Sequence, residues 1–262
     1  MHPPRAGLES LPMPTIAAVS LGNSTVAAGL WRGSRFFFRN RLPTADLGRK
    51  ALFAGARRRD LAGVAVAAVA AVVPARERAL ERAIRRELGA ACPVRWLGRD
   101  LDPGLKLRVK CPAAVGADRL ASSLAAWRRF GAAVVVDFGT AVTVNAVSAT
   151  GEFLGGAILP GAELSARALA AGTARVRVRP PEKAVRPPGR STAGAVTAGA
   201  TYGLAGAVDR LVAETAAALG GRPALVATGG GAKRIVPLCR TKFRVLPDLV
   251  LEGLARAASE ST

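Results

Sequence analysis

Three glycine-centred turns in this 262-residue chain each follow a run of apolar residues, at Gly22–Ser24, Asp137–Thr140 and Thr228–Gly231. Glycine leaves the backbone N–H groups and nearby hydroxyls of such turns open to close approach, which a polyphosphate requires. None of the three is a Walker loop, because the Gly-Lys-Ser/Thr ending is absent, and none is the dinucleotide-binding fingerprint. One such turn would be weak support, but three in order along the chain favour a nucleotide-phosphate site.

Two similar strand patterns must position these turns. Residues 15–31 predict a β-hairpin with its turn at Gly22–Ser24, and residues 35–39 predict a third strand. The same order starts again at Ala132, with strands running into Asp137, over 141–147 and over 152–158. This repetition predicts an α/β fold of two duplicated domains that face each other across a central cleft.

The predicted domains cover residues 15–130 and 131–262, after a disordered leader at 1–14. Other apolar patterns predict buried strands over 63–73 and 225–228, with one or two short strands within 94–110. Helical periodicity predicts helices near 45–56, over 75–88, 117–130, 163–171 and 193–219, and from Leu249 onward. Residues 173–190 are basic, rich in proline and without periodicity, so they are predicted to form a loop or lid.

Composition excludes several classes of function. The three cysteines are too few and too irregularly spaced for a disulfide framework or a zinc site, and the only histidine, His2, stands in the leader, which excludes histidine acid–base catalysis. The apolar run 61–73 is shorter than the ~20 residues of a membrane helix. No secretory signal is recognised at the N-terminus, so we expect a cytoplasmic protein without a membrane partner.

The formal charge of +20 comes from 38 Lys and Arg against 18 Asp and Glu. Such a balance can indicate nucleic acid, an anionic surface or an anionic substrate. The basic residues are scattered along the chain and are not interleaved with aromatic residues, so a solvated basic surface from an arginine-rich composition is favoured over a nucleic-acid role.

Short motifs follow one another along the chain at Val115–Ala121, Asp137–Thr143, Gly151–Gly161, Leu164–Leu169, Gly189–Thr192, Gly199 with Gly203 and Gly206, and Ala227–Gly230. Through these motifs the chain resembles the type III pantothenate kinases, of the actin, Hsp70 and sugar-kinase superfamily. Their order and spacing, and not any one motif alone, make the resemblance specific over nearly the whole chain after the leader.

The resemblance implies two ribonuclease H-like (actin-like ATPase) domains. It also implies ATP-dependent phosphorylation of pantothenate to 4'-phosphopantothenate, the first step of coenzyme A biosynthesis. The family's enzymes are homodimers that need Mg²⁺ and a monovalent cation such as K⁺ or NH4⁺.

By the same resemblance, Asp118 is the base that accepts the proton of the substrate hydroxyl, and Asp137 holds the monovalent cation. One positioned carboxylate with a metal suffices for phosphoryl transfer, which needs alignment and charge neutralisation above all. The implied pantothenate-binding residues are Val109, Gly116, Ala117, Asp118, Arg119 and Thr192. The implied ATP-binding residues are Ser20, Leu21, Gly22, Asn23, Ser24, Thr25, Ala27 and Thr140.

Four positions depart from the family pattern. The first phosphate motif commonly begins with aspartate and ends with lysine, whereas this chain has Ser20 and Ala27 there. A tyrosine that commonly lines the pantothenate pocket is Val109, and a common Thr-x-Asp is Thr143-Val-Asn145. Without the aspartate and the lysine, the chain lacks electrostatic interactions with the metal and the phosphates that usually contribute much of the rate acceleration in phosphoryl transfer.

Two readings of these departures belong to different classes. In the first, the protein is a working kinase in which Ser20 holds the metal through water and one of the arginines supplies the missing positive charge. In the second, it is a degenerate homologue that binds ligands and acts as a regulatory or accessory protein. We favour the kinase, because Asp118, Arg119, Asp137 and Thr140 are retained.

Overall fold

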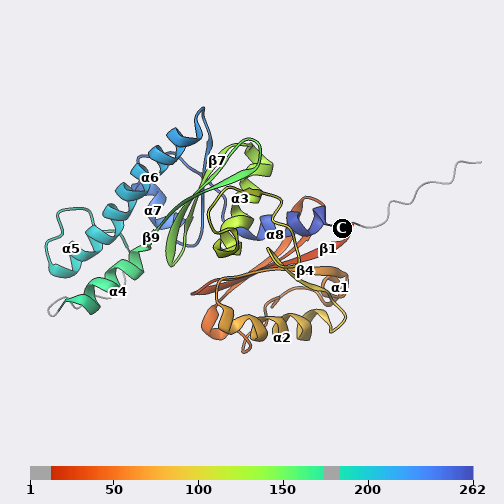
Figure 1. Cartoon of the computed structure of the whole chain (residues 1–262). Coiled ribbons are helices and arrows are strands. Elements are labelled where there is room, and N and C mark those ends of the chain that lie inside the picture. Colours follow the sequence, from red (N-terminus) through yellow and green to blue (C-terminus); the bar gives the residue numbers. More distant parts are fainter. Residues whose placement is uncertain (1–12, 174–182, 262) are drawn as a thin grey trace, which may run out of the picture.

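The computed structural model describes residues 13–173 and 183–261, which form two mixed β-sheets with helices around and between them (Figure 1). The leader at 1–14 therefore lies largely outside the described residues, and so does the half of the predicted 173–190 loop that spans 174–182. Among those residues, no helix combines the length and the apolar character needed to cross a bilayer.

The first sheet has the order β3-β2-β1-β4-β5. Its antiparallel part confirms the predicted hairpin and third strand, and β4 and β5 continue the sheet in parallel. The strands are β1 (Thr15–Leu21), β2 (Thr25–Arg32), β3 (Arg35–Pro43), β4 (Val64–Ala71) and β5 (Val94–Trp96).

The second sheet repeats this topology in the order β9-β8-β7-β10-β11, with β6 added beside β9. Its strands are β6 (Lys106–Leu107), β7 (Ala133–Phe138), β8 (Ala141–Val147), β9 (Glu152–Pro160), β10 (Ala224–Thr228) and β11 (Arg244–Val245). Two sheets with the same strand order and the same first hairpin confirm the predicted duplication.

Helices α1 (Arg58–Ala62) and α2 (Glu77–Leu88) are on the outer side of the first sheet (Figure 1). The outer side of the second sheet carries α4 (Ala162–Gly172) and one long helix made of α5 (Thr192–Ala198), a π-helical turn (Gly199–Gly203) and α6 (Leu204–Leu219). The short α7 (Ala232–Ile235) follows the turn after β10. All but α1 and α7 agree with a predicted helix.

Helices α3 (Ala117–Phe130) and α8 (Leu249–Glu260) pack against each other between the two sheets (Figure 1). Their backbones touch where a side chain at Gly253 would overlap the carbonyl of Ala121. Both helices contribute to one buried core with residues of both sheets, such as Ile16 and Val135. The last helix therefore packs on the first sheet, and the division of the chain at residue 130 stays a prediction.

The helix predicted near 45–56 is wrong. The segment has one 3-10 turn at Thr44–Asp46 and then turns, with Gly48 and Gly55 at φ +87° and +91°. The Glu87 carboxylate accepts the N–H groups of Leu52 and Phe53, whose side chains are buried in the core of the first sheet. Positive φ values interrupt a helix, and the tertiary contacts of Leu52 and Phe53 outweigh the local periodicity.

Candidate active site

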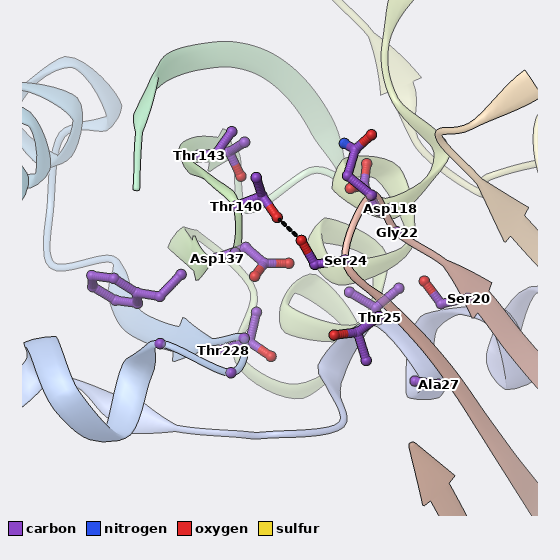
Figure 2. Close-up of a pocket in the computed structure, with 18 of the residues that line it drawn as sticks. Ser20, Gly22, Ser24, Thr25, Ala27, Asp118, Asp137, Thr140, Thr143 and Thr228 are labelled. Carbon is purple, nitrogen blue, oxygen red and sulfur yellow. Dashed lines mark hydrogen bonds between the residues drawn. The ribbon is translucent and has the colours of Figure 1, made fainter. Parts of the chain in front are cut away.

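A cavity of about 410 Å³ lies between the two sheets and is lined by both hairpin turns (Figure 2). The start of α3 contributes Asp118, and the glycine turn after β10 contributes residues 228–231. All three predicted glycine turns therefore meet in one cavity, although more than 200 residues separate the first from the last. The volume is in the range of cavities that hold a drug-sized ligand, roughly 300–1,000 Å³.

The turn of the first hairpin is held by backbone bonds. Gly22 N–H donates to the carbonyl of Thr25 over 2.9 Å, and the Thr44 hydroxyl donates to the carbonyl of Gly22 over 2.8 Å. Thr44 N–H also donates to the carbonyl of Ser24. With these bonds made, the turn keeps its shape without the help of a ligand.

The turn of the second hairpin has a matching bond, from Gly139 N–H to the carbonyl of Ala141 over 3.1 Å. Gly161, which follows β9, donates to the carbonyl of Thr140. A Cβ at Gly161 would lie 2.6 Å from the carbonyl oxygen of Gly139, so only glycine fits there. The Pro160-Gly161 part of the sequence motif thus supports the second turn from outside.

The two turns contact each other through side-chain hydroxyls. Ser24 Oγ and Thr140 Oγ1 are 2.8 Å apart, as the dashed line in Figure 2 marks. This bond is exposed to solvent. The two hydroxyls therefore meet where the turns approach each other, and either could donate to an anion that enters between them.

Asp137 is half-buried at the end of β7, and desolvation raises the pKa of its carboxyl to about 7. That pKa already includes a smaller rise caused by the negative charge of Asp118 and a lowering caused by the Arg41 guanidinium. A side chain at Gly229, which has φ +88°, would collide with Asp137 Oδ1. The carboxyl is thus held in a poorly solvated place where a bound cation would replace its proton.

Asp118 is the second residue of α3, beside the helix N-cap Gly116. Burial raises the pKa of its carboxyl, and a bond from the Arg119 N–H to Asp118 Oδ1 (2.8 Å) partly offsets that rise, as does the Arg119 charge. A raised pKa makes a carboxylate a stronger base for a hydroxyl proton.

Arg119 points to β8 and β9. Its Nε donates to the Oδ1 of buried Asn145 over 2.7 Å, its guanidinium lies 5.4 Å from the centre of the Phe153 ring, and burial lowers its pKa. Asn145 Nδ2 in turn donates to Thr143 Oγ1. The departure at Asn145 therefore gives Arg119 a neutral partner, which leaves more of its charge for an anionic ligand.

Nine of the residues predicted for the site line this cavity, and the others lie outside its lining. The nine are Ser20, Gly22, Asn23, Ser24, Thr25, Ala27, Asp118, Asp137 and Thr140. Leu21 is buried in the core of the first sheet, so only its backbone can serve a ligand. Gly116 and Ala117 immediately precede Asp118 at the start of α3.

Val109 and Thr192 are further from the turns. Val109 lies beside Gly155 of β9, where an added Cβ would be 3.4 Å from Val109 Cγ1. Thr192 is the first residue of α5, and the N-cap of that helix is Ser191, whose hydroxyl accepts the N–H of Gly194 over 3.1 Å. The roles predicted for the site residues remain predictions.

Arg167 of the Leu164–Leu169 motif lines the cavity, and so do four charged residues that the motifs do not contain: Arg41, Glu163, Arg234 and Asp248. The sequence pattern contains a signal that could have pointed to Arg41. The strand that follows a hairpin usually pairs with that hairpin, so the residues of this strand lie beside the hairpin in the sheet. Asp248 directly precedes the predicted last helix, a position typical of a capping carboxylate. Neither signal says by itself that the side chain faces the cleft.

The donor set fits a metal held chiefly by phosphate oxygens. The described residues contain no cluster of three histidine, cysteine, aspartate or glutamate side chains that could hold a metal ion. Mg²⁺ typically binds through one or two carboxylates, substrate phosphates and waters, so a separate protein cage is not required. The carboxyl of Asp137 and the hydroxyls of the turns place hard oxygen atoms in the same cavity, which is the kind of ligand that hard cations prefer.

Comparisons with known proteins agree with this geometry. The profile of the type III pantothenate kinase family matches residues 16–214. A type III pantothenate kinase of Moorella thermoacetica is 36% identical over 253 residues, covering 91% of this chain and 96% of that protein. One from Nocardia farcinica is 46% identical over 160 residues, covering 58% of this chain and 60% of that protein.

Among solved structures, a ROK family glucokinase of Streptomyces griseus, in complex with glucose and AMPPNP, has a TM-score of 0.53 at 12% identity. The match covers 94% of this chain and 99% of the glucokinase. A conserved Baf family protein of Campylobacter jejuni has a TM-score of 0.59 at 17% identity, covering 94% and 98%. These likenesses show that the two-domain fold is that of the actin-like ATPases and sugar kinases.

Proposed function

This chain belongs to the type III pantothenate kinase family, and on that premise we propose which of its residues carry the reaction. The protein is a kinase that transfers the γ-phosphoryl group of ATP to the hydroxyl of pantothenate. One observation carries the assignment to the cleft: the two hairpin turns, Asp118 and Asp137 line a single cavity.

Asp118 accepts the proton of the pantothenate hydroxyl while that oxygen attacks the γ-phosphorus. The bond from the γ-phosphorus to the bridging oxygen breaks, and ADP leaves with the electron pair. The raised pKa of Asp118 supports this role, as does its place in the same cavity as the hydroxyl-bearing turns. Gly116 and Ala117 leave space beside the base, and Arg119 provides a guanidinium suited to the carboxylate of pantothenate.

The kinase uses ATP with a divalent metal, and we propose Mg²⁺ as that metal. Residues 20–27 and Thr140 would hold the ATP phosphates, with Ser20 reaching the metal through water. A monovalent cation, K⁺ or NH4⁺, would bind at Asp137. The raised pKa of Asp137 supports the last assignment, because a carboxyl that resists ionisation when empty gains most from a cation beside it.

We propose further that the protein is a cytoplasmic homodimer. An apolar hollow lies between β9, α4 and the α5–α6 helix, and exposed Ile158, Leu164 and Leu169 are on these elements. Exposed apolar surface of this kind is typical of contacts between subunits. Thr192, at the start of α5, would then approach the pantothenate of the partner subunit. Sedimentation equilibrium should give about twice the 26.8 kDa chain mass, and a monomer at micromolar concentration would contradict the dimer.

The experiment that tests the function measures ADP release with Mg-ATP, K⁺ and pantothenate. Replacing Asp118 with Asn should lower kcat by about 1,000-fold while ATP still binds, because the base is lost but the phosphate turns are not. Glu214→Gln on the exposed face of α6 is the matched control and should keep full activity.

The non-catalytic alternative predicts a different result. A degenerate homologue would bind ATP or pantothenate without turnover, and Asp118→Asn would change nothing. The described cleft favours the kinase, because both carboxylates and both turns are assembled in it.

A further inference from the structure

A row of side chains crosses the first sheet on the side that faces the cavity. Ser20 of β1 is paired with Ala27 of β2, and Ala27 is paired with Arg41 of β3. Directly opposed residues of antiparallel strands share one face of the sheet, and all three line the cavity. Figure 2 shows Ser20 and Ala27 side by side on these strands, below the two turns.

The first hairpin has no charge of its own. Residues 15–31 contain no acidic or basic side chain. A polyphosphate held between two turns brings several negative charges, and in phosphoryl transfer their neutralisation is a large part of catalysis. The cation in the same cross-strand row as Ser20 and Ala27 is Arg41.

The Arg41 guanidinium is oriented before any ligand binds. Its Nη2 donates to the carbonyl of Pro247 over 2.6 Å and to Asp248 Oδ1 over 3.0 Å. Its Nε and Nη1 make no hydrogen bond to another residue within 13–173 and 183–261. Arginine has five N–H donors in a rigid fork, so the group is anchored by one nitrogen and keeps donors for an anion.

The ion pair with Asp248 adds too little stability to explain why an arginine stands at position 41. The side chain is 41% exposed, and such surface pairs stabilise a fold little. Asp248 also has a second partner, because Arg39 Nε is 2.7 Å from Asp248 Oδ2. The Arg41 charge is also felt at the second turn, where it lowers the pKa of Asp137.

We propose that Arg41 contacts the β- and γ-phosphates of ATP and supplies the positive charge that the hairpin of residues 20–27 lacks. This inference rests on the proposed function, since it assigns a further phosphate-contacting residue to the same cavity. The Asp248 and Pro247 contacts make the guanidinium a preorganised donor, which costs little reorganisation when ATP binds.

The test compares Arg41→Gln with Arg39→Gln. Both variants remove one arginine from Asp248 and leave the other, but only Arg41 lines the cavity. Arg41→Gln should lower kcat/KM for ATP by about 100-fold, whereas Arg39→Gln should change it less than about threefold. Equal losses in the two variants would overturn the proposal, because they would assign the effect to Asp248.

Charge rescue makes the test independent of a folding defect. Adding Ala27→Lys to Arg41→Gln places an ammonium in the same cross-strand row and should recover about tenfold in kcat/KM. A double variant no better than Arg41→Gln, in protein whose circular dichroism matches the unchanged chain, contradicts the proposal.

Nucleotide binding separates this inference from the proposed function. Calorimetry without pantothenate should show that Arg41→Gln weakens the binding of ATP by about 30-fold or more. The binding of AMP should weaken by less than about twofold, because AMP has no β- or γ-phosphate. If the unchanged protein shows no turnover but Arg41→Gln still weakens the binding of ATP alone, the kinase assignment is wrong and the proposed contact of Arg41 with the phosphates stands. An equal loss for ATP and AMP would remove Arg41 from the phosphate site.

Discussion

The hairpin of β1 and β2 and the hairpin of β7 and β8 occupy equivalent places in their sheets. Each ends in a glycine turn closed by the same kind of backbone bond, and each is followed by a third antiparallel strand. The cross-strand row at the turn reads Ser20, Ala27 and Arg41 in the first sheet, and Asp137, Thr143 and Ile158 in the second.

The backbones of the two halves agree, but the charges do not. The second hairpin has its acidic group on the first strand, whereas the first hairpin is uncharged over residues 15–31 and its row is charged only on the third strand. The difference teaches that the duplicated backbone determines where phosphates can bind, while the charges that meet them can come from any strand that reaches the same row.

The largest expected effect within this comparison is at Asp137, which has no charged counterpart in the first hairpin. Asp137→Asn should abolish activation by K⁺ and lower kcat about 10- to 100-fold, the usual cost of losing support at a metal site. Titrating activity with K⁺ at fixed Mg-ATP measures both. If K⁺ still activates the variant, Asp137 is not the monovalent site.

The pH dependence of the same group has a definite sign. With a pKa of about 7, Asp137 is protonated at lower pH and must lose its proton to bind K⁺. The K⁺ concentration for half-maximal activity should therefore fall about tenfold per pH unit from pH 5.5 towards 7 and then become constant. A half-maximal concentration that does not vary over this range would contradict the raised pKa.

In the absence of cations, the free energy of unfolding should fall as the pH rises, whereas the affinity for K⁺ should increase. A carboxyl with a raised folded-state pKa stabilises the fold at low pH, and this contribution is lost as pH rises through about 7. Asp137→Asn should thus be more stable than the unchanged chain at pH 8, by roughly 2 kcal/mol, and lose that advantage as the pH falls to about 4. Urea unfolding at the two pH values measures the difference.

A smaller effect is expected from making the first row resemble the second. Ser20→Asp introduces a carboxylate beside the phosphates and opposite Ala27, with Arg41 in the same row to offset its charge. The Mg²⁺ concentration for half-maximal activity should fall by roughly tenfold, because a direct carboxylate replaces a bond through water. Ser34→Asp, at the exposed far turn of the same strands, is the control. A higher Mg²⁺ requirement in Ser20→Asp would show that the two rows are not equivalent.

The smallest effect concerns the contact between the turns. Ser24→Ala removes the exposed 2.8 Å bond to Thr140 and should raise KM for ATP by less than about fivefold. Thr140→Ser keeps the hydroxyl and is the matched variant with no expected change. A loss above about 30-fold in Ser24→Ala would mean that the first turn, and not the second, dominates phosphate binding.

Much of the fold could be predicted from sequence because its signals are local. Apolar alternation around Gly22 and Asp137 specified both hairpins, and their repetition predicted the duplicated sheets. The helix over 117–130 was equally clear from its periodicity and places Asp118 at its first turn. The segment 45–56 failed because its conformation depends on Glu87, a partner in a helix about 35 residues away.

The sequence by itself determined the phosphate turns, the ligand class they suit and the carboxylates available to them. Only the tertiary structure decided that Arg41 faces the cleft. Counting from the turn pair Arg32 and Arg35, a regular ladder would place Asn40 opposite Ala27, but a bulge between Leu30 and Trp31 moves Arg41 there. A shift of one residue reverses which side of the sheet a side chain faces, and that shift is set by packing across strands and not by local preference.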